Sequence, residues 1–304
     1  MGTFRSLCRF VSLLLAAVLY ILPATAQTLP APDHTVVVIF ENHSYSQIIG
    51  SKFAPHINGM AKSPHAAVFT QCYALTHPSQ PNYLFLFSGS RQGCKDDALP
   101  HGVPFVTANL GAELLRGGKT FVTYSALLPY AGDTVEVAGK YARKHNPMVN
   151  WQGSGINQLP PELNQPFDAF PSPANYASLP TLCYVIPNLD DDMHDTSPNE
   201  NITLGDNWVQ KHLEPLLRWA LKNNTLIVLT FDEDNTPYNQ YQSTLGKINR
   251  SRIPTIFYGP MIKGGHYNNV ADHINILHTF EDMYHLGHAG ASDTAHAITG
   301  CWKN

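Results

Sequence analysis

Short apolar runs of four to eight residues, rich in β-branched and aromatic side chains, recur along this chain between segments with helical periodicity. Runs of this composition are typical of strands buried on both faces of a sheet. Alternation of such strands with helices predicts an α/β fold, with a mostly parallel sheet sandwiched between helices. We expect strands at residues 35–40, 83–87, 120–124, 182–186, 226–231 and 255–258, and helices at 106–115, 206–222 and 270–284.

Residues 1–26 have the pattern of a secretory signal peptide. Arg5 and Arg9 precede an apolar stretch at 10–22, which small residues follow where a signal peptidase would cleave. The stretch is shorter than the roughly 20 residues that span a bilayer. We therefore expect an exported protein, periplasmic or secreted, without stable membrane insertion. Residues 27–304 should form a single domain.

The charge of the chain is modest. Removal of the signal peptide would take away Arg5 and Arg9 and change the formal charge from −4 to −6. A chain with this balance does not attract nucleic acid or an anionic membrane through bulk charge. We expect a small substrate and no nucleic-acid partner.

Four cysteines lie beyond the predicted signal peptide, at Cys72, Cys94, Cys183 and Cys301. An even number in an exported chain favours two disulfides over free buried thiols. Three pairings are open, and proximity of the loops favours Cys72 with Cys94 and Cys183 with Cys301.

Polar residues directly follow two of the expected strands. Glu41 and Asn42 follow the first, and Asp232 and Glu233 follow the strand at 226–231. In an open α/β sheet the site lies at the carboxyl ends of the strands, so one site would collect all four. Crowded carboxylates repel unless a cation neutralises them, and oxygen ligands suit a divalent ion such as Ca²⁺, Mg²⁺ or Zn²⁺. The alternative is that the acids are solvated loop residues.

Ser79 lies between Pro78 and Pro81, whose rings stiffen the backbone and orient the hydroxyl. A divalent cation can activate such a serine as a nucleophile without a histidine base. The alternative is a rigid turn without a catalytic role. The chain has no Gly-x-Ser-x-Gly elbow and no phosphate-binding Gly-x-x-x-x-Gly-Lys loop, which disfavours common serine hydrolases and P-loop enzymes.

Several histidines are candidates for chemistry. His194 lies between Asp192 and Asp195, and flanking carboxylates can keep an imidazole protonated as a general acid; otherwise it is a surface histidine. His273 opens an expected helix and either contacts an anion or caps that helix. The histidines near the C-terminus match no standard zinc spacing, so we expect no transition-metal site at His278, His285, His288 and His296.

Six motifs, taken in order, resemble the phosphoesterase family of acid phosphatases and phosphatidylcholine-type phospholipases C. The resemblance spans nearly the whole chain after residue 26 and implies an alkaline-phosphatase-like fold with its site above the carboxyl edge of the sheet. The motifs are Glu41–Tyr45, His77–Tyr83, Tyr141–Pro147, Pro187–Asp195, Phe231–Asn235 and Asp272–His273.

The resemblance also implies a role for each matching residue. Ser79 falls at the position of the nucleophile, and His194 near the phosphoryl oxygens or the leaving group. The metal ligands would be Glu41, Asn42, Asp232 and Glu233. Substrate contacts would come from Asn42, Asn82, His145, Asp192, Asp195 and His273.

Residues and resemblance together predict a metal-dependent phosphomonoesterase, an acid phosphatase that works through a phosphoserine intermediate. A phospholipase C or another phosphodiesterase on the same scaffold is the nearest competing function. The short segment after residue 284 is too small for the extra C-terminal domains of longer family phospholipases, which favours the monoesterase. Two further candidates are a non-catalytic secreted protein that binds phosphate or metal, and a zinc hydrolase built on the C-terminal histidines.

Overall fold

The computed structural model describes residues 28–236 and 251–303, so the predicted signal peptide lies outside the described residues. An eight-stranded sheet has the order β11-β2-β10-β9-β1-β8-β4-β7. The strands from β9 to β7 are parallel, whereas β10 pairs antiparallel with β9 and β2. The predicted mostly parallel α/β sheet is confirmed. The strands are β1 His34–Phe40, β2 Ala66–Phe69, β4 Phe121–Ser125, β7 Asn164–Pro166, β8 Leu182–Ile186, β9 Thr225–Phe231, β10 Thr255–Tyr258 and β11 Gly265–Tyr267.

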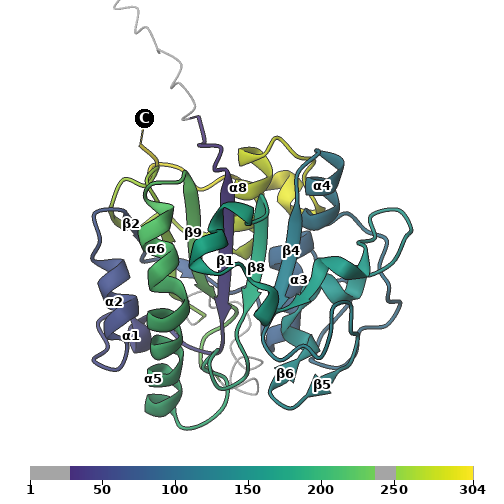
Figure 1. Cartoon of the computed structure of the whole chain (residues 1–304), viewed down its shortest axis with the longest axis horizontal. Coiled ribbons are helices and arrows are strands. Elements are labelled where there is room, and N and C mark those ends of the chain that lie inside the picture. The colour runs from purple at the N-terminus through teal and green to yellow at the C-terminus, as the bar shows by residue number, and fades with distance from the viewer. Residues whose placement is uncertain (1–27, 237–250, 304) are drawn as a thin grey trace, which may run out of the picture.

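Helices cover both faces of the sheet (Figure 1). In that view, α5, the π-helix η6 and α6 run in front of the sheet, whereas α3 and α8 pack together behind it. The helices are α1 Tyr45–Ile48, α2 Pro55–Ala61, α3 Ser79–Ser88, α4 Leu110–Arg116, α5 Pro198–Trp208, η6 Val209–Leu213, α6 Glu214–Ala220 and α8 His273–Met283.

Shorter elements connect these layers. Two small sheets are formed by β3 Cys72–Tyr73 with β12 Ala271–Asp272, and by β5 Val137–Ala138 with β6 Tyr141–Ala142. The 3-10 helices are η1 Arg143–His145, η2 Pro147–Trp151, η3 Pro161–Leu163, η4 Phe167–Ala169, η5 Pro173–Ser178 and η8 Gly290–Thr294.

The register between β1 and β9 places the site. The two strands pair over their whole length, from His34 opposite Thr225 to Phe40 opposite Phe231. Both strands are almost fully buried, which explains their nearly unbroken apolar sequences. Glu41 and Asp232 therefore leave the sheet side by side at its carboxyl edge.

One predicted strand is wrong. Residues 83–87 lie inside α3, in which nine of the ten residues are buried. A run that is apolar on all sides fits a buried helix as well as a buried strand, so periodicity alone cannot separate them. Because the run is helical, Ser79 stands at a helix N-terminus.

The predicted disulfides are not found, because all four cysteines are free thiols. Cys183 lies in β8, paired with Val36 of β1 and Val122 of β4. Cys301 lies beside Lys263, whose amide donates to its carbonyl, just beyond β10. Because β9 and β1 separate β10 from β8, the fold keeps these two thiols apart.

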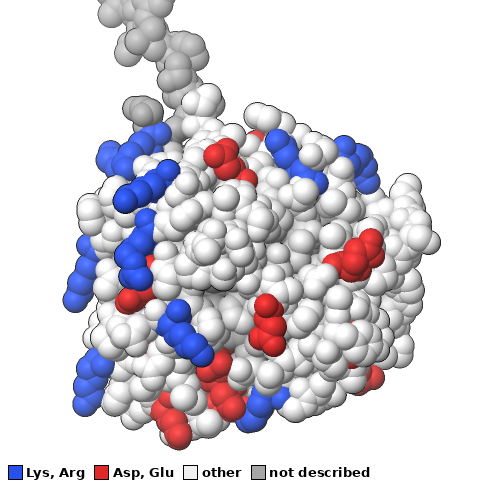
Figure 2. All heavy atoms as spheres, viewed as in Figure 1, with Lys and Arg blue, Asp and Glu red and all other residues white. Residues whose placement is uncertain are grey.

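Charged side chains are sparse on the surface. On the face that Figure 2 shows, basic and acidic residues are interspersed among uncharged ones, in keeping with a chain in which 14% of residues are charged. Within residues 28–236 and 251–303, no helix has the length and apolar character needed to cross a membrane.

Candidate active site

Two strand ends bring Glu41 and Asp232 together. The backbone amide of Asp232 donates to the carbonyl of Phe40 at 3.0 Å, and that of Asn42 donates to Asp232 Oδ1 at 3.1 Å. Asn42 has a positive φ of 48°, which asparagine tolerates better than most residues, so the chain turns sharply after Glu41. Both acids are almost completely buried.

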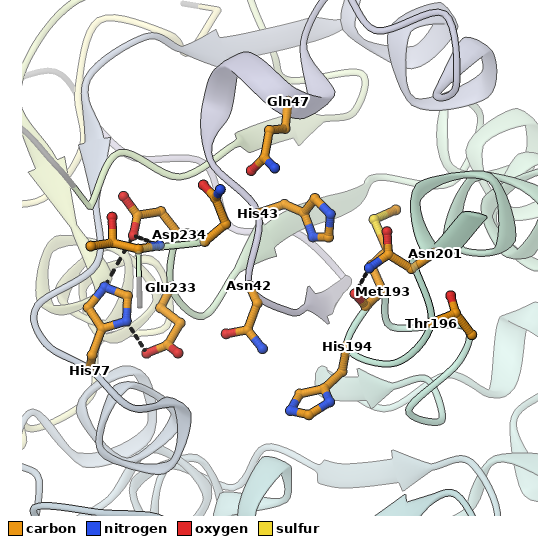
Figure 3. A pocket seen from close by; sticks show the side chains of 12 residues that line it. Asn42, His43, Gln47, His77, Met193, His194, Thr196, Asn201, Glu233 and Asp234 are labelled. Atoms are coloured by element: carbon orange, nitrogen blue, oxygen red, sulfur yellow. Dashed lines mark hydrogen bonds and ion pairs between the residues drawn. The ribbon is translucent and has the colours of Figure 1, made fainter. Parts of the chain in front are cut away.

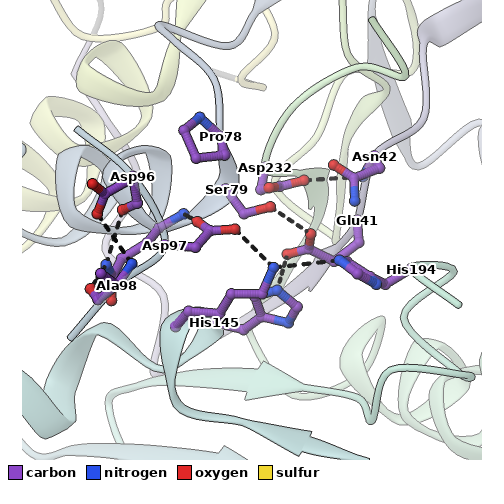
Figure 4. A network of polar contacts seen from close by, with 12 residues as sticks. Glu41, Asn42, Pro78, Ser79, Asp96, Asp97, Ala98, His145, His194 and Asp232 are labelled. Carbon is purple, nitrogen blue, oxygen red and sulfur yellow. Dashed lines mark hydrogen bonds and ion pairs between the residues drawn. The ribbon is translucent and has the colours of Figure 1, made fainter. Parts of the chain in front are cut away.

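The N-terminus of α3 delivers Ser79 to these acids (Figure 4). Its hydroxyl donates to Glu41 Oε2 at 3.0 Å, and Tyr83, one turn later, donates to Glu41 Oε1. The positive end of the helix dipole lies at this turn and favours an anion. Ser79 therefore stands where a phosphoryl group would be stabilised.

The buried acids require a positive partner. Burial raises the pKa of Glu41 well above its usual value, and the charges of Asp232 and Asp192 raise it further. Burial likewise raises the pKa values of Asp192 and Asp232. Among the described residues, no hydrogen-bond partner reaches Asp232 Oδ2. An unpartnered carboxylate oxygen in a buried cluster fits a divalent cation.

His145, on η1, lies between two of these acids. Its Nε2 is 3.3 Å from Glu41 Oε1 and its Nδ1 is 3.2 Å from Asp192 Oδ2, while the ring stacks on Tyr83. Burial, followed by the charge of Lys144, lowers the pKa of His145 well below its usual value. A neutral imidazole at this position leaves a lone pair directed at the site.

His194 is held from both sides. Its Nδ1 is 2.9 Å from Asp195 Oδ1, and Lys140 donates to Asp195 Oδ2 at 2.7 Å. The backbone amide of His194 donates to Asp192 Oδ1. Its Nε2 accepts from the Lys144 ammonium at 3.3 Å, so Nδ1 carries the proton that binds Asp195 in this arrangement.

Glu233 turns toward His77 (Figure 3). His77 lies 3.0 Å from Glu233 Oε2 and 3.2 Å from Asp234 Oδ1. Burial raises the pKa of Glu233 to about 8. Burial lowers the pKa of His77, but hydrogen bonds to Asp234 and Glu233 outweigh it and raise that pKa to about 9. Of the four predicted metal ligands, Glu41 and Asp232 directly follow the paired ends of β1 and β9.

Two of the predicted substrate contacts make hydrogen bonds to the backbone. The Asn82 side chain accepts from the amides of Leu75 and Thr76 and donates to the Thr76 carbonyl, which fixes the turn before Ser79. His273 Nε2 is 2.9 Å from the carbonyl of Phe231, directly before Asp232. The cap of α8 is Asp272, whose side chain accepts from two amides of the first turn.

A cleft of about 430 Å³ opens beside the acids, and Figure 3 shows the side chains around it. Asn42, His77, His194 and Glu233 line this cleft. His194 also lines a second, smaller cavity of about 180 Å³ together with Lys144. Cavities of this combined size accommodate a small alcohol and its phosphate.

Three site residues were missed by the sequence interpretation: His77, Tyr83 and Lys144. Each lies inside one of the six quoted motifs, within two residues of a predicted site residue. Lys144 donates to Asp97 Oδ2 at 2.9 Å and is the one lysine, among the described residues, within hydrogen-bonding distance of His194. Position within a motif was the available signal, but it does not reveal which side chains point inward.

Comparison with known proteins identifies the family of this chain. A sequence model of the Phosphoesterase family matches residues 52–287. The chain is 43% identical to a phosphatidylinositol-3-phosphatase of Mycobacterium tuberculosis over 277 residues, which cover 91% of this chain and 85% of that protein. It is 33% identical to an acid phosphatase of Aspergillus fumigatus, over 56% of this chain and only 38% of that protein.

A solved structure shows the same fold at low sequence identity. It is a member of the alkaline phosphatase superfamily from Vibrio parahaemolyticus, with a TM-score of 0.58 and 13% identity, over 84% of this chain and 68% of that one. The chain therefore belongs to the phosphoesterase family, has the fold of the alkaline phosphatase superfamily, and is a hydrolase that acts on phosphoric esters.

Proposed function

We propose that this protein is an exported, metal-dependent phosphomonoesterase that works through a phosphoserine at Ser79. The observation that carries the proposal is the Ser79 hydroxyl at the start of α3, in contact with Glu41 among buried acids. Export rests on the pattern of residues 1–26, and a mature protein that still begins at Met1 would contradict cleavage near Gln27.

Glu41 and Asp232 would hold a divalent cation, together with the predicted ligands Asn42 and Glu233. Support comes from the buried Asp232 Oδ2, which lacks a partner among the described residues, and from the raised pKa values of the acids. When bound, such an ion supplies positive charge that stabilises a serine alkoxide and the phosphoryl oxygens. Ca²⁺, Mg²⁺ and Zn²⁺ all remain compatible with the oxygen ligands.

The residues around Ser79 account for the remaining chemistry. The Oγ proton moves to Glu41 Oε2 as Oγ attacks phosphorus, and the bond from phosphorus to the departing alcohol oxygen breaks. The positive end of the α3 dipole and the Lys144 ammonium stabilise charge on the phosphoryl oxygens. Water gives a proton to His194 and attacks the phosphoserine, the bond from phosphorus to Oγ breaks, Oγ takes its proton back from Glu41, and phosphate leaves.

His194 serves as the proton donor to the departing alcohol in this scheme. In this structure His194 Nε2 accepts a hydrogen bond from Lys144. When His194 is protonated, another group must lie between its positive charge and that of Lys144. A phosphate placed between Lys144 and His194 accepts a hydrogen bond from each. Asp195 then holds the imidazolium through Nδ1.

Replacement of Ser79 tests the nucleophile. Ser79→Ala should lower turnover of p-nitrophenyl phosphate by at least about 10³-fold, as loss of a nucleophile does elsewhere, with an unchanged melting temperature. Ser178→Ala, at an exposed serine of η5, is the matched control and should keep full activity. Acid quenching with a ³²P-labelled substrate should trap label on the wild type and on Ser178→Ala, but not on Ser79→Ala. Full activity of Ser79→Ala would remove Ser79 from its role.

The substrate class is tested by comparing a monoester with a diester. The name of the Mycobacterium tuberculosis relative suggests a phosphoinositide, and a cleft of about 430 Å³ suits a ring-sized alcohol. We expect p-nitrophenyl phosphate and short-chain phosphatidylinositol 3-phosphate to be hydrolysed faster than bis-p-nitrophenyl phosphate. Faster turnover of the bis-ester would favour a phosphodiesterase, and no turnover of any ester would favour a binding protein.

A further inference from the structure

We propose that His278, Asp282 and His288 form a second metal site, one that binds a first-row transition-metal dication such as Zn²⁺. His278 and Asp282 lie one turn apart in α8, and His288 follows in the loop after the helix. His278 Nε2 is 3.2 Å from Asp282 Oδ2, and His288 Nε2 is 2.9 Å from Asp282 Oδ1. Ligand atoms from all three residues lie within 4.8 Å of one another.

These separations suit coordination. Tetrahedral zinc with bonds of about 2.0–2.1 Å places its ligand atoms about 3.3 Å apart. Two imidazoles and one carboxylate are ligands that borderline metals such as Zn²⁺ bind better than Ca²⁺ or Mg²⁺. The rings of His278 and His288 stack with centroids 4.2 Å apart, so Asp282 faces both imidazoles together.

The hydrogen bonding of His278 is the strongest indication of a metal. Its Nδ1 lies 2.7 Å from the carbonyl oxygen of Ser292, which can only accept, so Nδ1 carries a proton. In the neutral ring Nε2 then presents a lone pair to the Asp282 carboxylate, and two acceptors face each other. A cation between them removes this conflict. Metal-binding histidines are commonly oriented in this way by a carbonyl on the other ring nitrogen.

The second site is separate from the catalytic one. Helix α8 begins with His273, which contacts Phe231 at the carboxyl edge of the sheet. It ends next to Tyr284, which contacts Thr35 and Thr181 at the amino edge. The cluster therefore lies near the opposite edge from Ser79, and an ion there would connect the last turn of α8 to the following loop.

The cluster is open to ions in solution. The side chain of Asp282 is 38% exposed and that of His288 is 26% exposed, so water can complete the coordination. His278 is nearly buried and fixed by Ser292, which gives the site one rigid ligand. A site of this kind stabilises the fold when it is filled, because the metal binds the folded chain and not the unfolded one.

Zinc binding to three variants tests the proposal. Full-length protein is stripped with chelator and titrated with Zn²⁺, and the bound zinc is counted after desalting. His288→Gln and Asp282→Asn should each bind one zinc fewer per chain than the wild type. They should also lose a Zn²⁺-dependent rise of several degrees in melting temperature, while keeping turnover of p-nitrophenyl phosphate. His296→Gln, at an exposed histidine outside the cluster, is the control and should behave as the wild type.

The results distinguish a metal-binding cluster from a hydrogen-bonded network of the same residues that holds no metal. Equal zinc counts for the wild type, His288→Gln and Asp282→Asn would overturn the proposal, as would a loss of zinc in His296→Gln alone. A further variant, Asp232→Asn with the cluster intact, should keep the zinc that His288→Gln loses. Its failure to do so would assign that zinc to the catalytic edge instead.

Discussion

Lys144 supplies a fixed positive charge to the site. Burial lowers its pKa, but Glu41 and Asp97 outweigh burial and raise the pKa above its usual value, so the side chain stays protonated. It lies 3.3 Å from His194 Nε2, which directs it toward the same space. A single lysine can thus both offset the buried acids and attract a phosphate dianion.

Loss of this charge should impair catalysis more than folding. Lys144→Met should lower kcat/KM for p-nitrophenyl phosphate by about 10²-fold, the scale of one preorganised electrostatic contact. Lys222→Met, at an exposed lysine, is the matched control and should leave kcat/KM unchanged. Equal kcat/KM values for the two variants would exclude Lys144 from the mechanism.

Lys140 should influence the acidic side of the pH profile. Its hydrogen bond to Asp195 lowers the pKa of that carboxyl group, so Asp195 stays ionised at more acidic pH. In Lys140→Met this pKa should rise toward its usual value, and Asp195 would be protonated earlier as pH falls. The acidic limb of kcat/KM should therefore move to higher pH, by less than about one unit because the pair is largely exposed. A shift to lower pH, or none, would contradict this role.

At the scale of elements, α2 depends on a side chain from another helix. Its N-cap is Ala54, whose side chain accepts no hydrogen bond. Asp206 of α5 accepts instead from the amides of His56 and Ile57, at 3.0 and 2.8 Å. The α2–α5 contact thus carries the capping function that usually lies within a helix.

Removal of this cap should destabilise the protein without affecting the site. Asp206→Ala leaves two amide donors without their acceptor and should lower the free energy of unfolding by about 2–3 kcal/mol. Asp168→Asn, at an exposed acid of η4, should be neutral in the same urea titration. Unchanged stability of Asp206→Ala would show that water caps α2 equally well.

The sequence pattern correctly predicts the strands in the centre of the sheet. The runs at 35–40, 182–186 and 226–231 become β1, β8 and β9, because a central parallel strand has apolar neighbours on both faces. The run at 83–87 fails because a helix packed on all sides has the same composition. The helix predicted at 270–284 begins at His273, where the Asp272 cap fixes its start.

Site residues can be predicted from the sequence where they directly follow the end of a strand. Glu41 and Asp232 meet because paired strands end together, which the sequence indicates. Lys144 and His77 come from connections whose path depends on packing far along the chain, so their approach to the acids has no local signal. The direction of Glu233 toward His77 has the same origin.

At the scale of the whole molecule, metal removal should affect both activity and stability. The acids Glu41, Asp192 and Asp232 repel one another in the core, and a cation offsets that repulsion. Dialysis against a chelator should therefore abolish most turnover and lower the melting temperature by several degrees, and divalent metal should restore both. His288→Gln, which keeps turnover before chelation, should lose it on chelator treatment just as the wild type does. A chelator-treated wild type with full turnover and no bound metal would contradict the catalytic cation.

The end-to-end pairing of β1 with β9 also limits how the chain can vary in length. Side chains alternate between the two faces of a strand, so one residue inserted into β1 would turn Glu41 away from Asp232. A deletion in β9 would have the same effect on Asp232. Insertions and deletions compatible with activity should therefore fall in the connections between strands, whereas these two strands keep a constant length.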